Sequence, residues 1–187
     1  MKKFKKIFKK ILPIALIVLV VVSSCVYISQ RINYVKSGIF EYEIRDFKDY
    51  KKSFELVSDK LWECYYAEKE KNDITKMMLS GMLEDTWIID CYMNESEKYE
   101  ITITLTEDVG RATSIIKEAF RSSSNEGLWF VTVTDKQIAF ASGKVPYAII
   151  RVKGFSRPDY LFSPDKPDKA YFKKISGKWY HGIRLTT

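Results

Sequence analysis

The chain contains one histidine, so acid–base chemistry that needs an imidazole would have to use His181. This residue lies within 178–185, a segment that carries no neighbouring serine, cysteine or acid at a spacing typical of a catalytic motif. One interpretation is a general base that acts with a distant cysteine or serine. The other is a strand residue hydrogen-bonded to the backbone or to solvent, which the absence of a local partner motif favours.

The remaining residue types form no recognisable catalytic motif. The sequence lacks a Gly-x-Ser-x-Gly turn, a phosphate-binding glycine loop, a His-Glu-x-x-His helix and a Cys-x-x-Cys pair. The adjacent acids Glu84–Asp85 and Glu107–Asp108 would point in different directions on a helix, so neither pair converges on a substrate. We therefore expect no enzymatic activity and assign no catalytic residue.

Three cysteines, Cys25, Cys64 and Cys91, make a poor metal-binding set. Two sulfurs outside the leader and one histidine fall short of the four ligands of a structural zinc site, and the 165–168 turn lacks the glycine and glutamate of a calcium loop. We expect no metal and no cofactor. Cys64 and Cys91 either pair, which would stabilise a domain outside the cytoplasm, or lie free in the core.

A group of basic and aromatic residues is the candidate ligand-binding surface. Such a surface would attract phosphate, anionic lipid or cell-wall polymer in a salt-dependent way. Scattered, solvated strand charges are the alternative interpretation. Its members are Lys144, Tyr147, Arg151, Lys153 and Arg157, with Phe155 among them.

The charge distribution argues against nucleic acid as the partner. The formal net charge is +7, but the first ten residues hold six lysines and no acid. Without them the chain carries 25 basic and 24 acidic residues, so the body is nearly neutral. With 46% apolar and 14% aromatic residues, that body has the composition of a folded domain.

The elements that would position these residues begin with a membrane segment. After the basic leader 1–10, residues 11–28 form an uncharged, mostly apolar run. As a helix this run would reach about 27 Å, close to the hydrocarbon thickness of a bilayer. The lysines before it predict a cytoplasmic N-terminus, with a connector at 29–45 and a domain at 46–187 outside the plasma membrane.

Three interpretations of this leader remain open. The first is an uncleaved single-pass signal anchor. The second is a lipoprotein leader, because residues 22–25 resemble the bacterial lipobox and would place the lipid on Cys25. The third is a cleaved secretory signal. All three place the body of the protein outside the cytoplasm.

Two amphipathic helices are expected in the body of the protein. Apolar residues recur at three- and four-residue steps over 46–71 and again over the helix that opens at Thr106. The methionine-rich segment 73–84 is ambiguous, and its apolar residues suggest a short helix broken near Gly81. The aromatic stripe on the first helix is typical of a helix laid on a sheet.

The other segments alternate as strands do. Residues 86–93 and 99–105 flank a polar turn, 128–134 and 137–142 form a hairpin, 147–152 follows, and 170–175 and 178–185 flank Ser176–Gly177. The expected fold class is α+β, with the N-terminal transmembrane helix followed by two amphipathic helices packed on a mostly antiparallel sheet.

These features predict a membrane-anchored interaction domain outside the cytoplasm, in keeping with a bacterial envelope protein. Its partner would be another envelope protein, a peptide or a surface polymer, with the membrane bound through residues 11–28. Two alternatives stay open: an envelope hydrolase that uses His181, and an inhibitory or immunity-type protein that acts outside the membrane.

Overall fold

The computed structural model describes residues 16–26, 28, 42–123, 127–143, 147–159 and 170–184. The chain divides into two compact units, Met1–Gly38 and Ile39–Thr187. In the first unit, residues 16–26 are helical and their side chains are exposed. Among the described residues, no helix is both long and apolar enough to cross a membrane. Part of the predicted membrane segment, at 11–15 and 27, lies outside the described residues.

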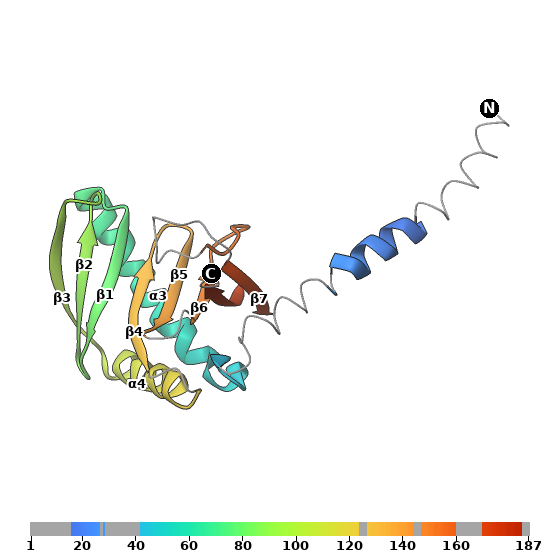
Figure 1. Ribbon diagram of the computed structural model, residues 1–187. Coiled ribbons are helices and arrows are strands. Elements are labelled where there is room, and N and C mark those ends of the chain that lie inside the picture. Colours follow the sequence, from blue (N-terminus) through green and yellow to red (C-terminus); the bar gives the residue numbers. More distant parts are fainter. Residues whose placement is uncertain are drawn as a thin grey trace. The chain divides into compact units, whose positions relative to one another are not determined.

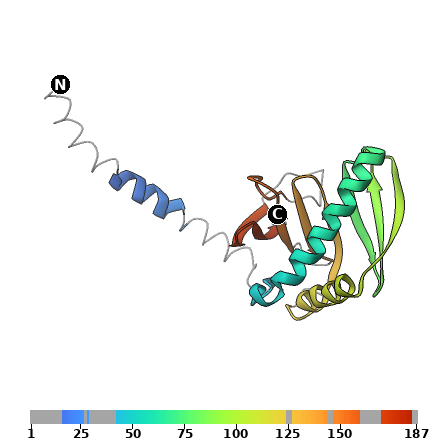
Figure 2. The ribbon, with the colours of Figure 1, turned by 180° about the vertical axis from the view of Figure 1, so that it is seen from behind.

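The second unit has an α+β fold, as predicted, in which two helices cover one face of an eight-stranded antiparallel sheet (Figures 1 and 2). The strand order is β3-β2-β1-β4-β5-β6-β8-β7. The elements are α3 (Phe47–Asn72), β1 (Lys76–Met82), β2 (Thr86–Tyr92), β3 (Lys98–Thr104), α4 (Glu107–Arg121), β4 (Leu128–Val133), β5 (Gln137–Ser142), β6 (Tyr147–Val152), β7 (Ala170–Ser176) and β8 (Trp179–Arg184).

Helix α3 lies across the sheet, and its apolar stripe is the centre of the core (Figure 2). Most of the stripe predicted from the sequence is buried, and Phe54 is fully enclosed, whereas Tyr50 and Cys64 are only partly buried. Leu56, on the opposite side of the helix, is exposed. Helix α4 adds a second amphipathic stripe and packs against α3. Both helices pack on the sheet, as the periodicity predicted, and the structure places them on the same face of it. The buried stripe of α3 comprises Phe47, Phe54, Val57, Leu61 and Tyr65.

The prediction of a short helix within 73–84 is wrong, because this segment is strand β1. The strand lies inside the sheet between β2 and β4, so Met77 and Leu79 face the helices while the next residues face the other side. At Gly81 the pairing register with β2 shifts, and the Ile88 side chain closes over the space that a Cβ would occupy. A strand covered by neighbours on both edges carries a nearly continuous apolar run, which resembles a buried helix in sequence.

The hairpins predicted from turn residues are present. Asn94 accepts hydrogen bonds from the backbone N–H groups of Ser96 and Glu97, which closes the turn between β2 and β3. Gly177, between β7 and β8, has φ of 55°, a left-handed conformation that glycine adopts without strain. Each turn aligns the two strands that it joins, and the helix-facing side chains of the sheet belong to one core.

The end of the predicted connector belongs to the folded unit. Ile44 is buried beside the core, and the chain turns at Asp46 into α3. Residues 42–44 thus pass directly along the sheet before the first long helix begins. This contact brings Glu43 to strand β8, which carries the only histidine, His181.

Candidate functional site

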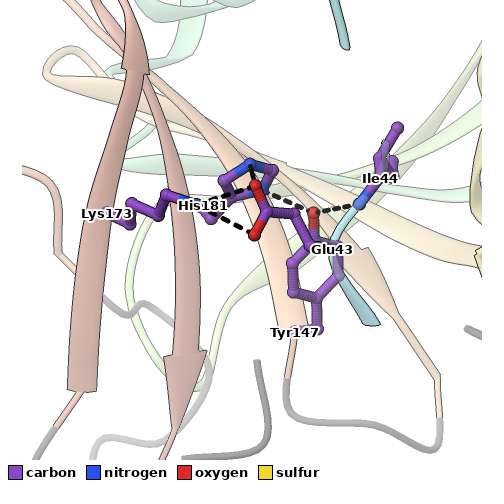
Figure 3. A network of polar contacts seen from close by, with 5 residues as sticks. All are labelled: Glu43, Ile44, Tyr147, Lys173 and His181. Atoms are coloured by element: carbon purple, nitrogen blue, oxygen red, sulfur yellow. Dashed lines mark hydrogen bonds and ion pairs between the residues drawn. The ribbon is translucent and has the colours of Figure 1, made fainter. Parts of the chain in front are cut away.

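A buried polar network surrounds His181 (Figure 3). His181 Nε2 lies 3.0 Å from Glu43 Oε1, and Nδ1 lies 2.7 Å from the Tyr147 hydroxyl. Both carboxylate oxygens of Glu43 accept from Lys173 Nζ at 3.0 Å. The Ile44 backbone N–H donates to the Tyr147 hydroxyl oxygen at 3.1 Å. Strands β6, β7 and β8 are thereby joined to the segment that precedes α3.

The hydrogen-bond directions assign one tautomer to His181. A carboxylate can only accept, so Nε2 carries the proton and donates it to Glu43. Nδ1 is then an acceptor, and the Tyr147 O–H donates to it. The Tyr147 oxygen in turn accepts from Ile44, so every group in the chain of hydrogen bonds has a partner of the right kind.

Burial decides the charge state of this imidazole. Only 1% of His181 is exposed, and the loss of water lowers the pKa of His181 below its ordinary value of 6.5. The hydrogen bond and charge of Glu43 oppose this shift, while the charge of Lys173 adds to it. His181 is therefore neutral at pH 7, in agreement with the tautomer that the hydrogen bonds require.

This geometry is typical of a buried hydrogen-bond network that stabilises the fold. Both ring nitrogens of His181 are hydrogen-bonded within the protein, so neither is free in this conformation to take a proton from a substrate. The prediction that His181 bonds to the backbone or to solvent is wrong, because its hydrogen-bond partners are the side chains of Glu43 and Tyr147. Sequence spacing alone could not reveal them, since both lie far from His181 along the chain.

The predicted basic–aromatic surface is divided by the fold. Tyr147 is fully buried and belongs to the network above. Arg151 lies under α3, where it donates to Asp59 at 2.6 Å and stacks near the rings of Trp62 and Trp179. Lys144 lies outside the described residues. The members of the predicted surface therefore do not form one patch in the part of the chain that the structure describes.

Lys153 and Arg157 remain near the surface, on the segment that follows β6. Lys153 Nζ donates to the Tyr66 hydroxyl at 2.7 Å, which ties this segment to α3. Arg157 is exposed and, with Lys136 and Asp135, lines an open hollow of about 590 Å³ beside the β4–β5 turn. Two of the predicted ligand-binding residues thus lie at the same end of the sheet.

Between them lies the most exposed aromatic side chain among the described residues. Phe155 is 108% exposed and follows Gly154, whose φ is 63°. The loop that carries it is held at both ends. The Lys153 N–H donates to the Lys136 carbonyl at 2.8 Å, and the buried Gln137 amide exchanges two hydrogen bonds, of 2.6 and 2.7 Å, with the Asp159 backbone. Phe155 is therefore exposed to solvent on a loop that hydrogen bonds fix at both ends.

The cysteines offer no reactive centre within the second unit. Cys64 and Cys91 are free, and burial raises the pKa of both thiols, that of Cys91 to about 11. A thiol protonated at neutral pH is a poor nucleophile. Among the described residues, no group of histidine, cysteine, aspartate and glutamate side chains is arranged to hold a metal ion.

Comparisons with protein-family models, with curated proteins and with solved structures found no match.

Proposed function

We propose that this protein is a membrane-anchored binding domain held outside the cytoplasm. In this proposal the binding end is the loop that carries Phe155, and the partner is a protein or peptide of the cell envelope. The observation that carries the proposal is the full exposure of an aromatic side chain on a fastened loop. A protruding aromatic side chain can serve as the anchor of an interface when it enters a pocket on the partner, because a few such side chains carry most of the binding energy.

The character of the first helix supports the anchor. The side chains of 16–22 are apolar and exposed on all sides of the helix. A helix that is apolar all round is stable when other apolar groups or lipid surround it. The lysine-rich leader before it and the mixed charges after it favour a cytoplasmic N-terminus. Cys25, which is free and exposed, is the alternative point of attachment through a lipid.

The place of Phe155 in the fold supports its role as the binding end. Residues 43 and 44 contact the sheet at Tyr147, the first residue of β6, whereas Phe155 follows Val152, its last residue. A six-residue strand is about 20 Å long, so the loop lies at the opposite end of the sheet from the point where the chain enters the domain. A tether on the entering chain would leave this loop accessible.

The charges near Phe155 indicate the chemistry of the partner. Four cations accompany it and outnumber the two nearby acids, Asp135 and Asp159: the cations are Lys136, Lys153, Arg157 and Lys178. An apolar pocket rimmed by carboxylates would match this arrangement, with the phenyl ring as the anchor and arginine as the charged contact. A single protruding ring suits a pocket on a protein better than a uniform polymer.

A photo-crosslinker tests the binding end. With benzoylphenylalanine in place of Phe155 in the full-length chain in membranes, we expect one discrete adduct. Arg157→Glu in the same chain should reduce its yield about tenfold, because a reversed rim charge opposes association. Arg111→Glu, on the exposed side of α4, is the matched charge reversal and should leave the adduct unchanged.

The contradicting outcomes are equally specific. The same crosslinker placed at Leu83, an exposed apolar residue in the turn between β1 and β2, serves as the positional control. An identical adduct from both positions would mean non-specific collision, and no adduct from position 155 would refute the loop as the binding end.

A further inference from the structure

Strand β3 forms one edge of the sheet, and its outer backbone groups point away from the rest of the domain. At the two ends of its pairing with β2, Met93 N–H donates to Glu97 O and Leu105 N–H donates to Asp85 O. In an antiparallel ladder, alternate residues bond to the same neighbour. The odd-numbered residues of β3 therefore bond to β2, and Lys98, Glu100, Thr102 and Thr104 direct their N–H and C=O groups outward.

This edge lacks the backbone features that usually prevent pairing. Its seven residues contain neither proline nor glycine, and its register with β2 runs without a bulge. The opposite edge, β7, differs: its register shifts between Lys174 and Ser176, and it carries two adjacent lysines. Bulges and edge lysines discourage strand addition, so β7 is protected in a way that β3 is not.

The single lysine of β3 does not protect the edge either. Lys98 Nζ forms an ion pair with Asp90 Oδ1 at 2.9 Å and lies 5.8 Å from the centre of the Tyr92 ring. Both partners belong to β2, so the ammonium group is drawn inward, toward the neighbouring strand. The outer backbone groups of β3 remain accessible.

The sequence of β3 is complementary to itself. An antiparallel pair centred on Ile101 would align all seven residues of two strands. On the face that carries the helices, Ile101 would meet its own counterpart and Tyr99 would meet Ile103 of the other copy. Pairs of β-branched and aromatic residues stabilise antiparallel strands. On the other face, Glu100 would lie opposite Thr102, so no like charges would be directly opposed.

Pairing would also bury more of the apolar side chains of β3 that face the helices. Tyr99, Ile101 and Ile103 are only partly buried where they pack against the core. The Tyr99 hydroxyl is already fixed by Glu68 and Asn72 of α3, at 2.9 and 2.8 Å. The edge is therefore preorganised, and a second strand would remove more of its apolar surface from water.

We propose that two copies of this chain associate through antiparallel pairing of their β3 strands. The product is a two-fold symmetric dimer with a continuous sheet of sixteen strands, eight from each copy. The two-fold axis places the chain entry points of the copies at opposite ends of this sheet.

Site-specific disulfide formation tests the register. In the full-length chain with Cys25→Ser, Ile101→Cys would face its own copy across a non-hydrogen-bonded pair, with about 4.5 Å between the Cα atoms, which a disulfide can span. Ile103→Cys is the matched control, because its counterpart would lie about 14 Å away along the strands. On mild oxidation in membranes we expect the crosslinked fraction for Ile101→Cys to be about tenfold that for Ile103→Cys.

A proline at the edge supplies the second measurement. Thr102→Pro removes an outward N–H and leaves the ladder with β2 intact, a position where edge strands tolerate proline. We expect it to abolish the Ile101→Cys crosslink and to convert the detergent-solubilised chain from dimer to monomer in sedimentation velocity. Thr102→Val, which keeps the N–H, should remain dimeric. Equal crosslinking at both cysteine positions, or a monomeric mass for the unaltered chain, would overturn the proposal.

Discussion

Replacing Phe54 with alanine is expected to lower the free energy of unfolding by about 3–5 kcal/mol, the usual cost of removing a buried phenylalanine. The ring is fully buried where α3 crosses the sheet. Its centre lies 5.0 Å from the Phe140 ring, 5.3 Å from Phe47 and 5.7 Å from Trp179. Alanine would leave a cavity among aromatic groups that cannot collapse into it. Denaturant unfolding of the full-length chain in detergent measures the change.

Leu56→Ala is the matched control for this substitution. Leu56 lies two residues away on the same helix, but its side chain is exposed. Surface substitutions of this kind usually change stability by less than about 0.5 kcal/mol. Similar losses for Phe54 and Leu56 would contradict the placement of α3 on the sheet.

Replacing Tyr147 with phenylalanine is expected to cost about 2–4 kcal/mol, because two buried groups lose their partners at once. The hydroxyl donates to His181 Nδ1 and accepts from the Ile44 N–H. Phenylalanine keeps the ring and its packing, so the loss would report on the hydrogen bonds alone. Unfolding by denaturant gives the magnitude, and hydrogen exchange at Ile44 should show faster opening of this segment.

Tyr180→Phe is the control for the hydroxyl. Tyr180 precedes His181 on β8, and its hydroxyl makes no hydrogen bond to the residues that the structure describes. We expect a change below about 1 kcal/mol, within the range of a solvated group. If both substitutions proved equally mild, the network would contribute nothing to stability, and residues 43–44 would not depend on it.

The helices and hairpins follow from local patterns, so they could be predicted. The three- and four-residue spacing of apolar residues on α3 and α4 and the turn residues Asn94 and Gly177 each act over a few positions. Strand β1 could not be identified in this way. Strand β1 pairs with β2 on one edge and with β4 on the other, and the residues of β1 do not predict either pairing.

The candidate sites depend on contacts between distant parts of the chain. The sequence places Glu43 in a connector, because nothing in its neighbourhood indicates that it meets His181. Tyr147, Arg151 and Arg157 are close in sequence, which groups them in one predicted surface, yet the face of β6 that carries the first two packs under the helices. Tyr147 and Arg151 can be separated from Arg157 only when the fold shows that their face of β6 packs against the helices. Phe155 was visible in the sequence, but its exposure was not.

The network around His181 and the Phe155 loop have different roles in this account. The network joins the segment before α3 to β6, β7 and β8 through Glu43 and Ile44. The Phe155 loop lies beyond the far end of β6. A rigid connection at one end and an exposed aromatic residue at the other suit a domain that is held by its N-terminus and binds with its opposite side.

The central claim is that the N-terminal segment anchors this domain outside the cytoplasm. The most direct test is alkaline phosphatase fused after Thr187 of the full-length chain in a bacterial cell, since this enzyme is active only outside the cytoplasm. We predict an active fusion in the membrane fraction, still membrane-bound with Cys25→Ala, and a soluble protein when residues 1–28 are removed. An inactive fusion, made in full and present in the cell, would contradict the account.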